Sequence, residues 1–376
     1  MPWRESSVVS ERLEFVRLAV EGVIPMAELC RRFGISRQTG YVWLGRYRVE
    51  GEAGLVDRSR RPGSHPDETP VEMVELVCAV REAHPVWGGR KIRGFLLRQG
   101  HQGVPAPSTI TQILRRNELL TDPVRPQRDY VRFQADAPNR LWQMDFKGWL
   151  TLRDGQRIHP LGILDDHSRY NLCLQASTDQ QTLTVQDYLT GVFTRYGLPD
   201  RMLMDNGSPW GHTTGFPWNP LTVWLADLDI RVSHIRPFHP QTQGKEERFH
   251  RTLDLEVLHR RRYWETRTQL QDAFDEFRRL YNHHRPHEAL GETITPADHY
   301  QPSTRRFPTQ LPPITYPEGT HIRQVSADAR FSFQGHTYRA GKPFKGKPIG
   351  IKATTTPGTW NIYYRHHHIK TITTNV

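Results

Sequence analysis

Acidic residues stand at three separated places where the surrounding pattern favours other residue types. Asp145 lies inside the apolar run LWQMDF, and Asp205 ends the apolar run RMLMDN. The third place is the stretch KEERFH at the expected start of a helix, where the residue is either Glu246 or Glu247. Carboxylate oxygens are ligands that Mg²⁺ and Mn²⁺ prefer, and two such ions can clamp the attacking and leaving oxygens of a phosphoryl displacement. The pattern therefore predicts metal-dependent chemistry on a nucleic-acid backbone.

Each of these acidic residues alone also has an ordinary structural explanation. A single Asp in a strand is commonly hydrogen-bonded or lies at an edge, and the Asp-Asn-Gly sequence at 205–207 is a common turn. Helical periodicity puts Glu246 on the arc of Phe249, whereas Glu247 shares a face with Arg251. Both arcs can point at a metal, so the residues themselves leave both glutamates as candidates.

The carboxylates can meet only if the surrounding chain folds as an α/β sheet. From about Leu141, four runs read as strands, with an amphipathic helix before the fourth, and a further helix, a strand and two helices follow. The order βββαβαβα predicts a three-layer α/β domain. In such a sheet the first strand lies beside the strand that follows the first helix. Asp145 and Asp205 are therefore expected to converge, and a glutamate from the last crossover helix can complete the site.

The N-terminal segment predicts a helix-turn-helix unit. ERLEFVRLAVEG has apolar residues at helical spacing, and a second helix through Phe33 leads to a tight turn at Gly34. Ser36 is the expected N-cap of the third helix. That helix enters a major groove in this motif, so its first residues are the expected base readers: Arg37, Gln38, Thr39 and Tyr41. An ordinary helical hairpin is the alternative.

A second unit, from Val71 to Leu120, repeats this signature. In PSTITQILRRNEL, Ser108 is the expected N-cap and the apolar residues face inward. Its outward residues are expected to touch DNA: Thr109, Gln112, Arg115 and Arg116. The Pro/Gly-rich linker between the units carries Arg58, Arg60 and Arg61, which suit an arm on a phosphate backbone or in a minor groove, or equally a solvated linker. Two units in tandem predict a long recognition site.

Beyond Tyr300, short strands separated by turn residues predict a small all-β barrel. Its basic and aromatic side chains suit contacts with a DNA backbone, and a module for protein contacts is the alternative: Arg323, Arg330, Tyr338, Lys342, Lys345, Lys347, Tyr363 and Tyr364. The triplet at 366–368, three histidines, is expected to alternate between the two faces of one strand. Metal binding by the triplet is therefore not expected.

Composition supports an anionic partner. The 376 residues include 51 basic and 40 acidic ones, a net charge of +11, which indicates nucleic acid. The three cysteines, Cys30, Cys78 and Cys173, are far apart and form no C-x-x-C pair, which favours a reducing compartment. No apolar run approaches the roughly 18 residues of a membrane helix, and the N-terminus lacks the apolar segment of a signal peptide. A cytoplasmic, nucleoid-associated location is expected.

Five stretches resemble one family. LWQMDF, LGILDDHSRY, MLMDNGSPW, FHPQTQGKEERFHRTL and YNHHRPHEALGETITPADHY are similar to the integrase-core transposases of bacterial insertion sequences, relatives of retroviral integrases with a ribonuclease-H-like fold. The resemblance implies an Asp-Asp-Glu metal site formed by Asp145, Asp205 and Glu247, which would hold two Mg²⁺ or Mn²⁺ ions. It also places His239, Gln243 and Lys245 near the DNA.

Two departures from the family pattern stand out. Glu247 follows Asp205 by 42 positions, a longer interval than is usual in the family, and the excess falls in WGHTTGFPWNPLT. The insertion is expected either to contact DNA or only to pack against the protein. The longer interval also weakens the assignment of Glu247 as the third metal ligand. The N-terminal His/His/Cys/Cys zinc site of retroviral integrases has no match, so structural zinc is not expected. Asp165 and Asp166 also lie in a family-like stretch, where a polar hairpin turn is the simpler explanation.

These observations predict a multidomain protein with an α/β ribonuclease-H-like core, N-terminal all-α helix-turn-helix units and a C-terminal all-β, SH3-like barrel. The expected segments are 1–54 and 71–125 (helix-turn-helix units), 55–70 (linker), 126–300 (core) and 301–376 (barrel). The predicted function is that of a DNA transposase, a metal-dependent polynucleotidyl transferase that cleaves 3′ ends and joins them to target DNA within a homo-oligomeric synaptic complex. The alternatives are a DNA-binding regulator with an inactive core and a nuclease of the same fold.

Overall fold

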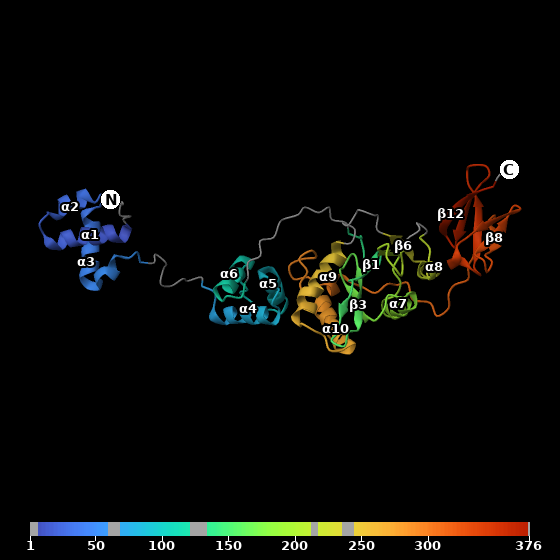
Figure 1. Ribbon diagram of the computed structural model, residues 1–376, viewed down its shortest axis with the longest axis horizontal. Coiled ribbons are helices and arrows are strands. Elements are labelled where there is room, and N and C mark those ends of the chain that lie inside the picture. Colours follow the sequence, from blue (N-terminus) through green and yellow to red (C-terminus); the bar gives the residue numbers. More distant parts are fainter. Residues whose placement is uncertain (1–6, 59–67, 121–133, 212–216, 235–243, 375–376) are drawn as a thin grey trace. The chain divides into compact units, whose positions relative to one another are not determined.

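The computed structural model describes residues 7–58, 68–120, 134–211, 217–234 and 244–374. The chain divides into two compact units, residues 1–68 and 69–376 (Figure 1). In the part of the chain that is described, no helix is long and apolar enough to cross a membrane. The sequence-derived division into five segments stays a prediction. Each compact unit is described separately below.

The first unit is a helical domain of the expected type. It contains α1 (Val8–Glu21), α2 (Met26–Arg32) and α3 (Arg37–Glu50), followed by the short 3₁₀ helix η1 (Gly51–Leu55). The turn at Gly34 has a φ of 65°, and the Ser36 hydroxyl caps α3 by accepting a hydrogen bond from the Thr39 amide. A Cβ at Gly40 would lie 2.7 Å from the Cys30 sulfur, so glycine lets α3 pack closely on α2. The predicted turn and N-cap are confirmed.

The second unit begins with three helices, α4 (Val71–Ala83), α5 (Gly89–Arg98) and α6 (Pro107–Arg116). The expected N-cap at Ser108 is wrong, because the N-cap of α6 lies two residues earlier, at Ala106, and the helix begins at Pro107. Pro107 explains the difference: its fixed φ suits the first helical position, where a missing N–H costs nothing. The predicted inward residues are buried, namely Ile110, Ile113 and Leu114.

Polar and apolar contacts join α4–α6 to the core. The buried Trp87 indole donates to Glu256, and Glu256 also accepts from the buried Arg285. Arg98 forms two hydrogen bonds with Asp298. These contacts are made by Trp87, just before α5, and by Arg98 at the end of α5, and they attach this helical region to the core.

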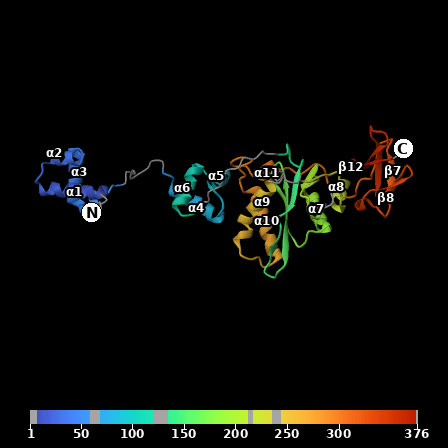
Figure 2. The same ribbon diagram turned by 45° about the horizontal axis from the view of Figure 1, so that its top comes forward.

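The core is a mixed sheet between two pairs of helices (Figure 2). Its path of strands is β2-β3-β1-β5-β6, and β4 pairs with β3. The strands are β1 (Trp142–Phe146), β2 (Leu150–Thr151), β3 (Arg157–Asp165), β4 (Asn171–Ser177), β5 (Arg201–Met204) and β6 (Arg231–His234). The helices are α7 (Thr182–Tyr196) and α8 (Pro220–Asp227) on one face, and α9 (Gly244–Glu256) and α10 (Arg267–His283) on the other. The predicted order of elements is confirmed, with β2 as a short addition.

Alternation along β1 decides which side chain faces which helix layer. Trp142 and Met144 are fully buried against residues of α7 and α8. The intervening Gln143 and Asp145 therefore face α9. On the same face, Leu164 of β3 packs against residues of α9 and α10. An acidic side chain in this strand is thus directed at the first turns of α9.

The C-terminal region forms two small antiparallel sheets. One has the order β12-β11-β10-β7 and the other pairs β8 with β9. Their strands are β7 (His321–Gln324), β8 (Arg330–Phe333), β9 (His336–Arg339), β10 (Pro348–Ala353), β11 (Thr359–Tyr364) and β12 (His367–Thr373). The short helix α11 (Pro296–His299) and the 3₁₀ helices η3 (Leu258–Arg260) and η4 (Lys342–Phe344) complete the described elements. The small all-β module is present, and an SH3-like barrel stays a prediction.

Two of the C-terminal side chains expected on a DNA-binding face point into the protein instead. Lys347 forms an ion pair of 2.9 Å with the buried Asp227 at the end of α8, and the fully buried Tyr364 also donates to Asp227. Arg365 adds a third contact to the same carboxylate. These contacts, and the packing of Val223 in the C-terminal core, fix the β module against α8.

Candidate active site

The register of β1 and β5 brings the two predicted aspartates together. These strands are parallel, with Trp142 paired to Met202 and Gln143 to Leu203. Continuing the same register places Asp145 opposite Asp205, which follows the last residue of β5 directly. The convergence expected from the order of elements therefore agrees with the pairing of the strands.

The carboxyl group of Asp145 lies in an environment that opposes its ionisation. Burial, followed by the negative charges of Asp205 and, to a smaller extent, Glu247, raises its pKa to about 7, against a hydrogen bond from the Phe146 amide. Among the described residues, no lysine or arginine forms an ion pair with Asp145, Asp205 or Glu247. Like charges thus meet here without a cationic side chain to offset them.

Asp205 is held in place by its own turn and by a tryptophan from the insertion. Its Oδ1 atom accepts hydrogen bonds from the Gly207 amide and from the Trp210 indole. Trp210 is 1% exposed and stacks on Phe146, the residue after Asp145, with ring centroids 5.1 Å apart. The described beginning of the insertion therefore packs beneath the two aspartates, and its residues 212–216 lie outside the described part.

The two glutamates of α9 lie in opposite environments. Glu246 is 0% exposed, and both its carboxyl oxygens are buried without a hydrogen-bond partner in the described structure. Burial, followed by the charge of Asp145, raises the pKa of Glu246 well above its usual value. Glu247 is exposed to solvent. The exposed Glu247 is the one of the two that a cation can reach from solvent, and its charge acts on Asp145, so Glu247 stays the predicted ligand.

His250, one turn along α9, lies between Asp145 and Glu246. Its Nδ1 atom is 3.8 Å from Asp145 Oδ2, and its Nε2 atom is 3.7 Å from Glu246 Oε2. Burial lowers the pKa of His250 to about 4, so the ring is neutral at pH 7. Gly162 of β3 lies next to both side chains: a Cβ there would be in ordinary van der Waals contact, 3.4 Å from Glu246 Oε2 and 3.6 Å from His250 Nε2.

The three carboxylates have the donor chemistry that a divalent cation requires. Their hard oxygen atoms and unbalanced negative charge fit Mg²⁺ or Mn²⁺. Among the described residues, they do not form a set whose ligand atoms all lie within 4.8 Å of one another. The site is thus a converging group of carboxylates and not a complete coordination sphere. We call Asp145, Asp205 and Glu247 the open carboxylates.

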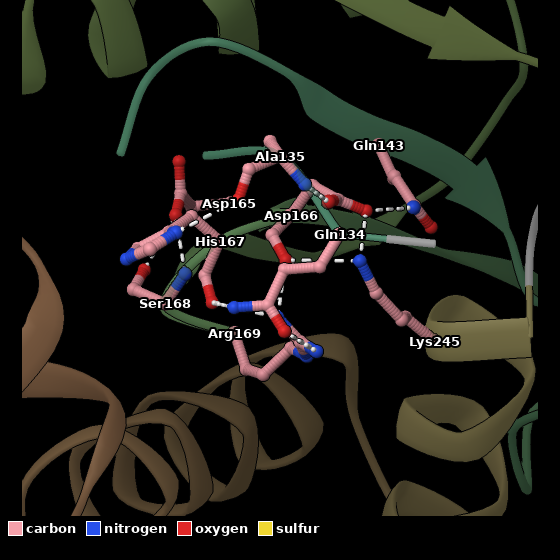
Figure 3. A network of polar contacts seen from close by, with 9 residues as sticks. All are labelled: Gln134, Ala135, Gln143, Asp165, Asp166, His167, Ser168, Arg169 and Lys245. Atoms are coloured by element: carbon pink, nitrogen blue, oxygen red, sulfur yellow. Dashed lines mark hydrogen bonds and ion pairs between the residues drawn. The ribbon is translucent and has the colours of Figure 1, made fainter. Parts of the chain in front are cut away.

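Asp165 and Asp166 form a second acidic group, which we call the turn carboxylates (Figure 3). Both are fully buried where β3 turns into β4. Asp165 accepts from the amide and hydroxyl of Ser168 and from the Asn139 amide. Burial raises the pKa of Asp165, and these hydrogen bonds oppose the rise. The predicted hairpin turn is confirmed, although its acidic residues are buried and not solvated.

Asp166 binds the first turn of α9. Its Oδ1 atom accepts from Lys245 Nζ and from Gln143 Nε2, and its Oδ2 atom accepts from the Ala135 amide. The Lys245 amine also donates to the Asp166 carbonyl. Lys245 was expected near DNA, and here it ties the start of α9, and with it Glu247, to the β3–β4 turn.

The remaining residues predicted to bind DNA lie at several surfaces. Arg37, Gln38 and Tyr41 are exposed on α3, and the half-buried Thr39 uses its hydroxyl in the cap with Ser36. On α6, three residues are exposed and Thr109 is half-buried: Gln112, Arg115 and Arg116. Arg58 forms an ion pair with Glu50. Four predicted residues lie outside the described residues: Arg60, Arg61, His239 and Gln243.

Family comparisons match nearly every part of the chain. Models described as "Integrase core domain" match residues 135–240 and 228–296. Models described as "Helix-turn-helix domain" and "Homeodomain-like domain" match residues 11–63 and 39–114. "IS481 family transposase, C-terminal domain" matches residues 320–375. The chain carries an integrase core domain together with helix-turn-helix domains and a transposase C-terminal domain. This assignment agrees with the helical N-terminal units, the mixed sheet and the C-terminal β module.

Two curated relatives are similar to this integrase-core protein. An uncharacterized 39.2 kDa protein of insertion element IS476 from Xanthomonas euvesicatoria is 25% identical over 276 residues, which cover 71% of this chain and 75% of the relative. The Pro-Pol polyprotein of feline foamy virus is 27% identical over 134 residues, 35% of this chain and 10% of that protein. The chain thus spans a small part of the viral polyprotein.

Solved structures of viral integrases are also similar in part. A chain of the simian T-cell lymphotropic virus intasome is 14% identical, with a TM-score of 0.38, and the match covers 80% of this chain and 99% of that one. The catalytic core of HTLV-2 integrase in complex with magnesium is 14% identical, with a TM-score of 0.34 and coverage of 45% and 100%.

Sequence reasoning missed two residues beside the open carboxylates. His250 follows Glu246 by four positions, the spacing that places two side chains on one helix face, and this signal was available. Trp210 follows Asp205 closely in the sequence, but only the fold shows that its ring packs on Phe146 and that its indole binds the carboxylate. Both help to position the aspartates.

Proposed function

We propose that this integrase-core protein is a DNA transposase that cleaves 3′ ends of its element and joins them to target DNA, using Asp145, Asp205 and Glu247 as metal ligands. The observation that carries the proposal is the parallel β1–β5 register, which puts the two aspartates side by side with a raised pKa at Asp145. Carboxylates that meet without a cationic side chain lower the free energy of unfolding. Such an arrangement is typical of a site that binds a cation as part of its function.

Mg²⁺ or Mn²⁺, two ions by the proposal, would supply charge stabilisation at the phosphate and a lower pKa for the attacking water or 3′-hydroxyl. The protein's own residues orient the carboxylates. Trp210 and the Gly207 amide hold Asp205, and β1 presents Asp145 toward α9. Lys245, bound to Asp166, holds the first turn of α9, so that Glu247 faces the same region. The buried Glu246 and the half-buried His250 lie against the inner side of Asp145.

DNA binding by the helical units fits their exposed faces. Arg37, Gln38 and Tyr41 at the start of α3 and Gln112, Arg115 and Arg116 on α6 offer guanidinium and amide donors to base edges and phosphates. The net charge of +11 adds salt-dependent affinity for the backbone. Joining two element ends requires at least two copies of the chain, so a synaptic homo-oligomer follows from the proposed reaction.

A strand-transfer assay tests the proposal. Full-length protein is incubated with Mg²⁺ and duplexes that carry the terminal inverted repeats flanking its gene, both uncut and pre-cleaved, at a stated salt concentration. We expect cleavage of the first and joined products from the second, and neither with Asp145→Asn. Cleavage without joining would identify a nuclease. Binding of the ends by wild type and variant alike, without cleavage by either, would identify a DNA-binding regulator and overturn the enzyme assignment.

A further inference from the structure

The β11–β12 turn brings two histidines next to an aspartate of the core. Arg365 in this turn has a φ of 53°, so His366 lies in the turn and His367 begins β12. The expectation that the histidine triplet alternates along one strand is therefore wrong. Asp229, between α8 and β6, meets the first two histidines: in the part of the chain that the structure describes, Asp229, His366 and His367 form the one set of three whose ligand atoms all lie within 4.8 Å of one another.

The contacts inside this set bring the three possible ligand side chains together. His366 Nε2 lies 3.1 Å from Asp229 Oδ1, and the rings of His366 and His367 have centroids 4.0 Å apart. His367 Nε2 is buried without a hydrogen-bond partner among the described residues. A buried ring nitrogen without a partner is an unfavourable arrangement that a metal bond would relieve.

The second oxygen of Asp229 faces a different group. Arg305 Nη2 lies 3.9 Å from Asp229 Oδ2 and also donates to the Asp229 carbonyl. The Arg305 guanidinium thus contacts Oδ2 and orients the carboxylate so that Oδ1 faces the histidines. Residues that contact metal-binding carboxylates from outside the site commonly orient them in this way. The guanidinium's positive charge, with those of Arg231 and Arg365 near His367, also repels a cation, so we expect weaker binding than at a four-ligand structural site.

The two segments are already held together by the Asp227 contacts. Lys347, Tyr364 and Arg365 all bind the Asp227 carboxylate, two residues before Asp229. The Asp227 contacts therefore hold the β11–β12 turn next to Asp229. Little further ordering of the chain is needed to bring the three ligands together.

We propose that Asp229, His366 and His367 bind one divalent first-row transition metal, with Zn²⁺ as the favoured ion. Two imidazoles and one carboxylate are ligands that Zn²⁺ accepts, and a water molecule would complete a tetrahedral site. The bound ion joins the loop between α8 and β6 to the β11–β12 turn and strengthens the attachment of the β module to the core. This site is separate from the open carboxylates and does not rest on the proposed transposase function.

Metal titrations of the full chain test this inference. The protein is stripped with EDTA, returned to excess Mg²⁺ to fill oxygen-only sites, and titrated with Co²⁺ by visible absorption and with Zn²⁺ by calorimetry. Asp229→Asn, His366→Gln and His367→Gln are compared with His368→Gln. His368 is the matched control, because its ring hydrogen-bonds to Thr371 and lies outside the set. Wild type and the control are expected to bind one equivalent, and the three variants at least about tenfold more weakly.

Thermal unfolding gives a second readout. His366 and Asp229 have half or more of their side chains exposed, 50% and 68%, so their variants are expected to fold like wild type without metal. Zn²⁺ should raise the unfolding temperature of wild type and of His368→Gln but not of His366→Gln. Equal binding by all four variants, loss of binding in His368→Gln, or no Co²⁺ and Zn²⁺ binding by wild type would overturn the proposal.

Discussion

The open carboxylates Asp145 and Asp205 and the turn carboxylates lie on neighbouring strands of one sheet or directly after them, and they differ in what surrounds their oxygen atoms. Around Asp165 and Asp166, amides, a hydroxyl, Gln143 and Lys245 supply donors to both oxygens of each side chain. Around Asp145, the neighbours that matter most for its pKa, after burial itself, are other carboxylates. The four aspartates of the two groups look alike in sequence, because each lies in an apolar strand or directly after one.

The difference indicates how each group contributes to the protein. Carboxylates that already have donors stabilise the fold and gain nothing from a metal ion. Carboxylates that face one another weaken the fold until a cation arrives. We infer that the turn carboxylates position α9 and that the open carboxylates carry the chemistry. The predictions below run from the largest expected effect to the smallest.

Removing one open carboxylate should abolish activity. We expect Asp145→Asn, Asp205→Asn and Glu247→Gln each to lower Mg²⁺-dependent cleavage by at least about 10³-fold, because each removes a proposed ligand of the metal ions that would stabilise the reacting phosphate. Glu246→Gln is the matched control, one residue away on the same helix, and should keep activity within about tenfold. Single-turnover cleavage rates measure this. An active Glu247→Gln beside an inactive Glu246→Gln would reverse the assignment of the two glutamates.

Breaking the turn carboxylates should instead cost stability. Asp166→Ala removes the carboxylate that accepts from the Lys245 amine, from Gln143 and from the Ala135 amide, and we expect the free energy of unfolding to fall by about 3–5 kcal/mol. Urea denaturation measures the loss. The double variant Asp166→Leu, Lys245→Met should lose less than the sum of the losses in Asp166→Leu and in Lys245→Met, because it removes both members of the ion pair together. An Asp166→Ala protein as stable as wild type would show that this network does not hold α9.

The stability difference between wild type and Asp145→Asn should depend on pH. The folded pKa of Asp145, about 7, lies well above the usual value for an aspartate, so ionisation of this carboxyl destabilises the fold. In metal-free protein the advantage of Asp145→Asn is therefore small near pH 4, grows as pH rises toward 7, and levels off above it at up to a few kcal/mol. Urea denaturation in EDTA between pH 5 and pH 8 measures it. A difference that stays constant with pH would contradict the proposed electrostatics.

Replacing Glu246 should have the smallest effect. Its buried carboxyl oxygens have no hydrogen-bond partner among the described residues, so Glu246→Met removes a desolvated polar group of similar volume. We expect the free energy of unfolding to change by about 1 kcal/mol or less, or to rise. Chemical denaturation tests this, with Glu246→Gln as the isosteric control. A loss of several kcal/mol in Glu246→Met alone would show that this carboxyl has a partner that stabilises the fold.

Much of this arrangement could be predicted from the sequence, because it depends on periodicity and order. Apolar strands and amphipathic helices gave the order of elements, and that order made Asp145 and Asp205 neighbours. The burial of Glu246 could not be predicted in this way, because both faces of α9 carry polar residues. Only the tertiary contact of Glu246 with Gly162 of β3 shows which face of the helix is buried. The wrong N-cap at Ser108 has a local cause, the proline before it.

Residues that meet through tertiary contacts were harder to predict. Trp210 reaches Asp205 from an insertion with no regular pattern. His366 and His367 meet Asp229 because a turn at Arg365 interrupts what reads as one continuous strand. A backbone reversal at a non-glycine residue leaves little signal in the sequence, so the alternation argument failed at that point.

The most direct test is anomalous diffraction from crystals of the full chain grown with Mn²⁺. The account predicts anomalous density between Asp145 and Asp205, with Glu247 turned toward it, and none at Asp165 and Asp166. Density at the turn carboxylates, or coordination by Glu246 in place of Glu247, would contradict the assignment of the chemistry to the open carboxylates.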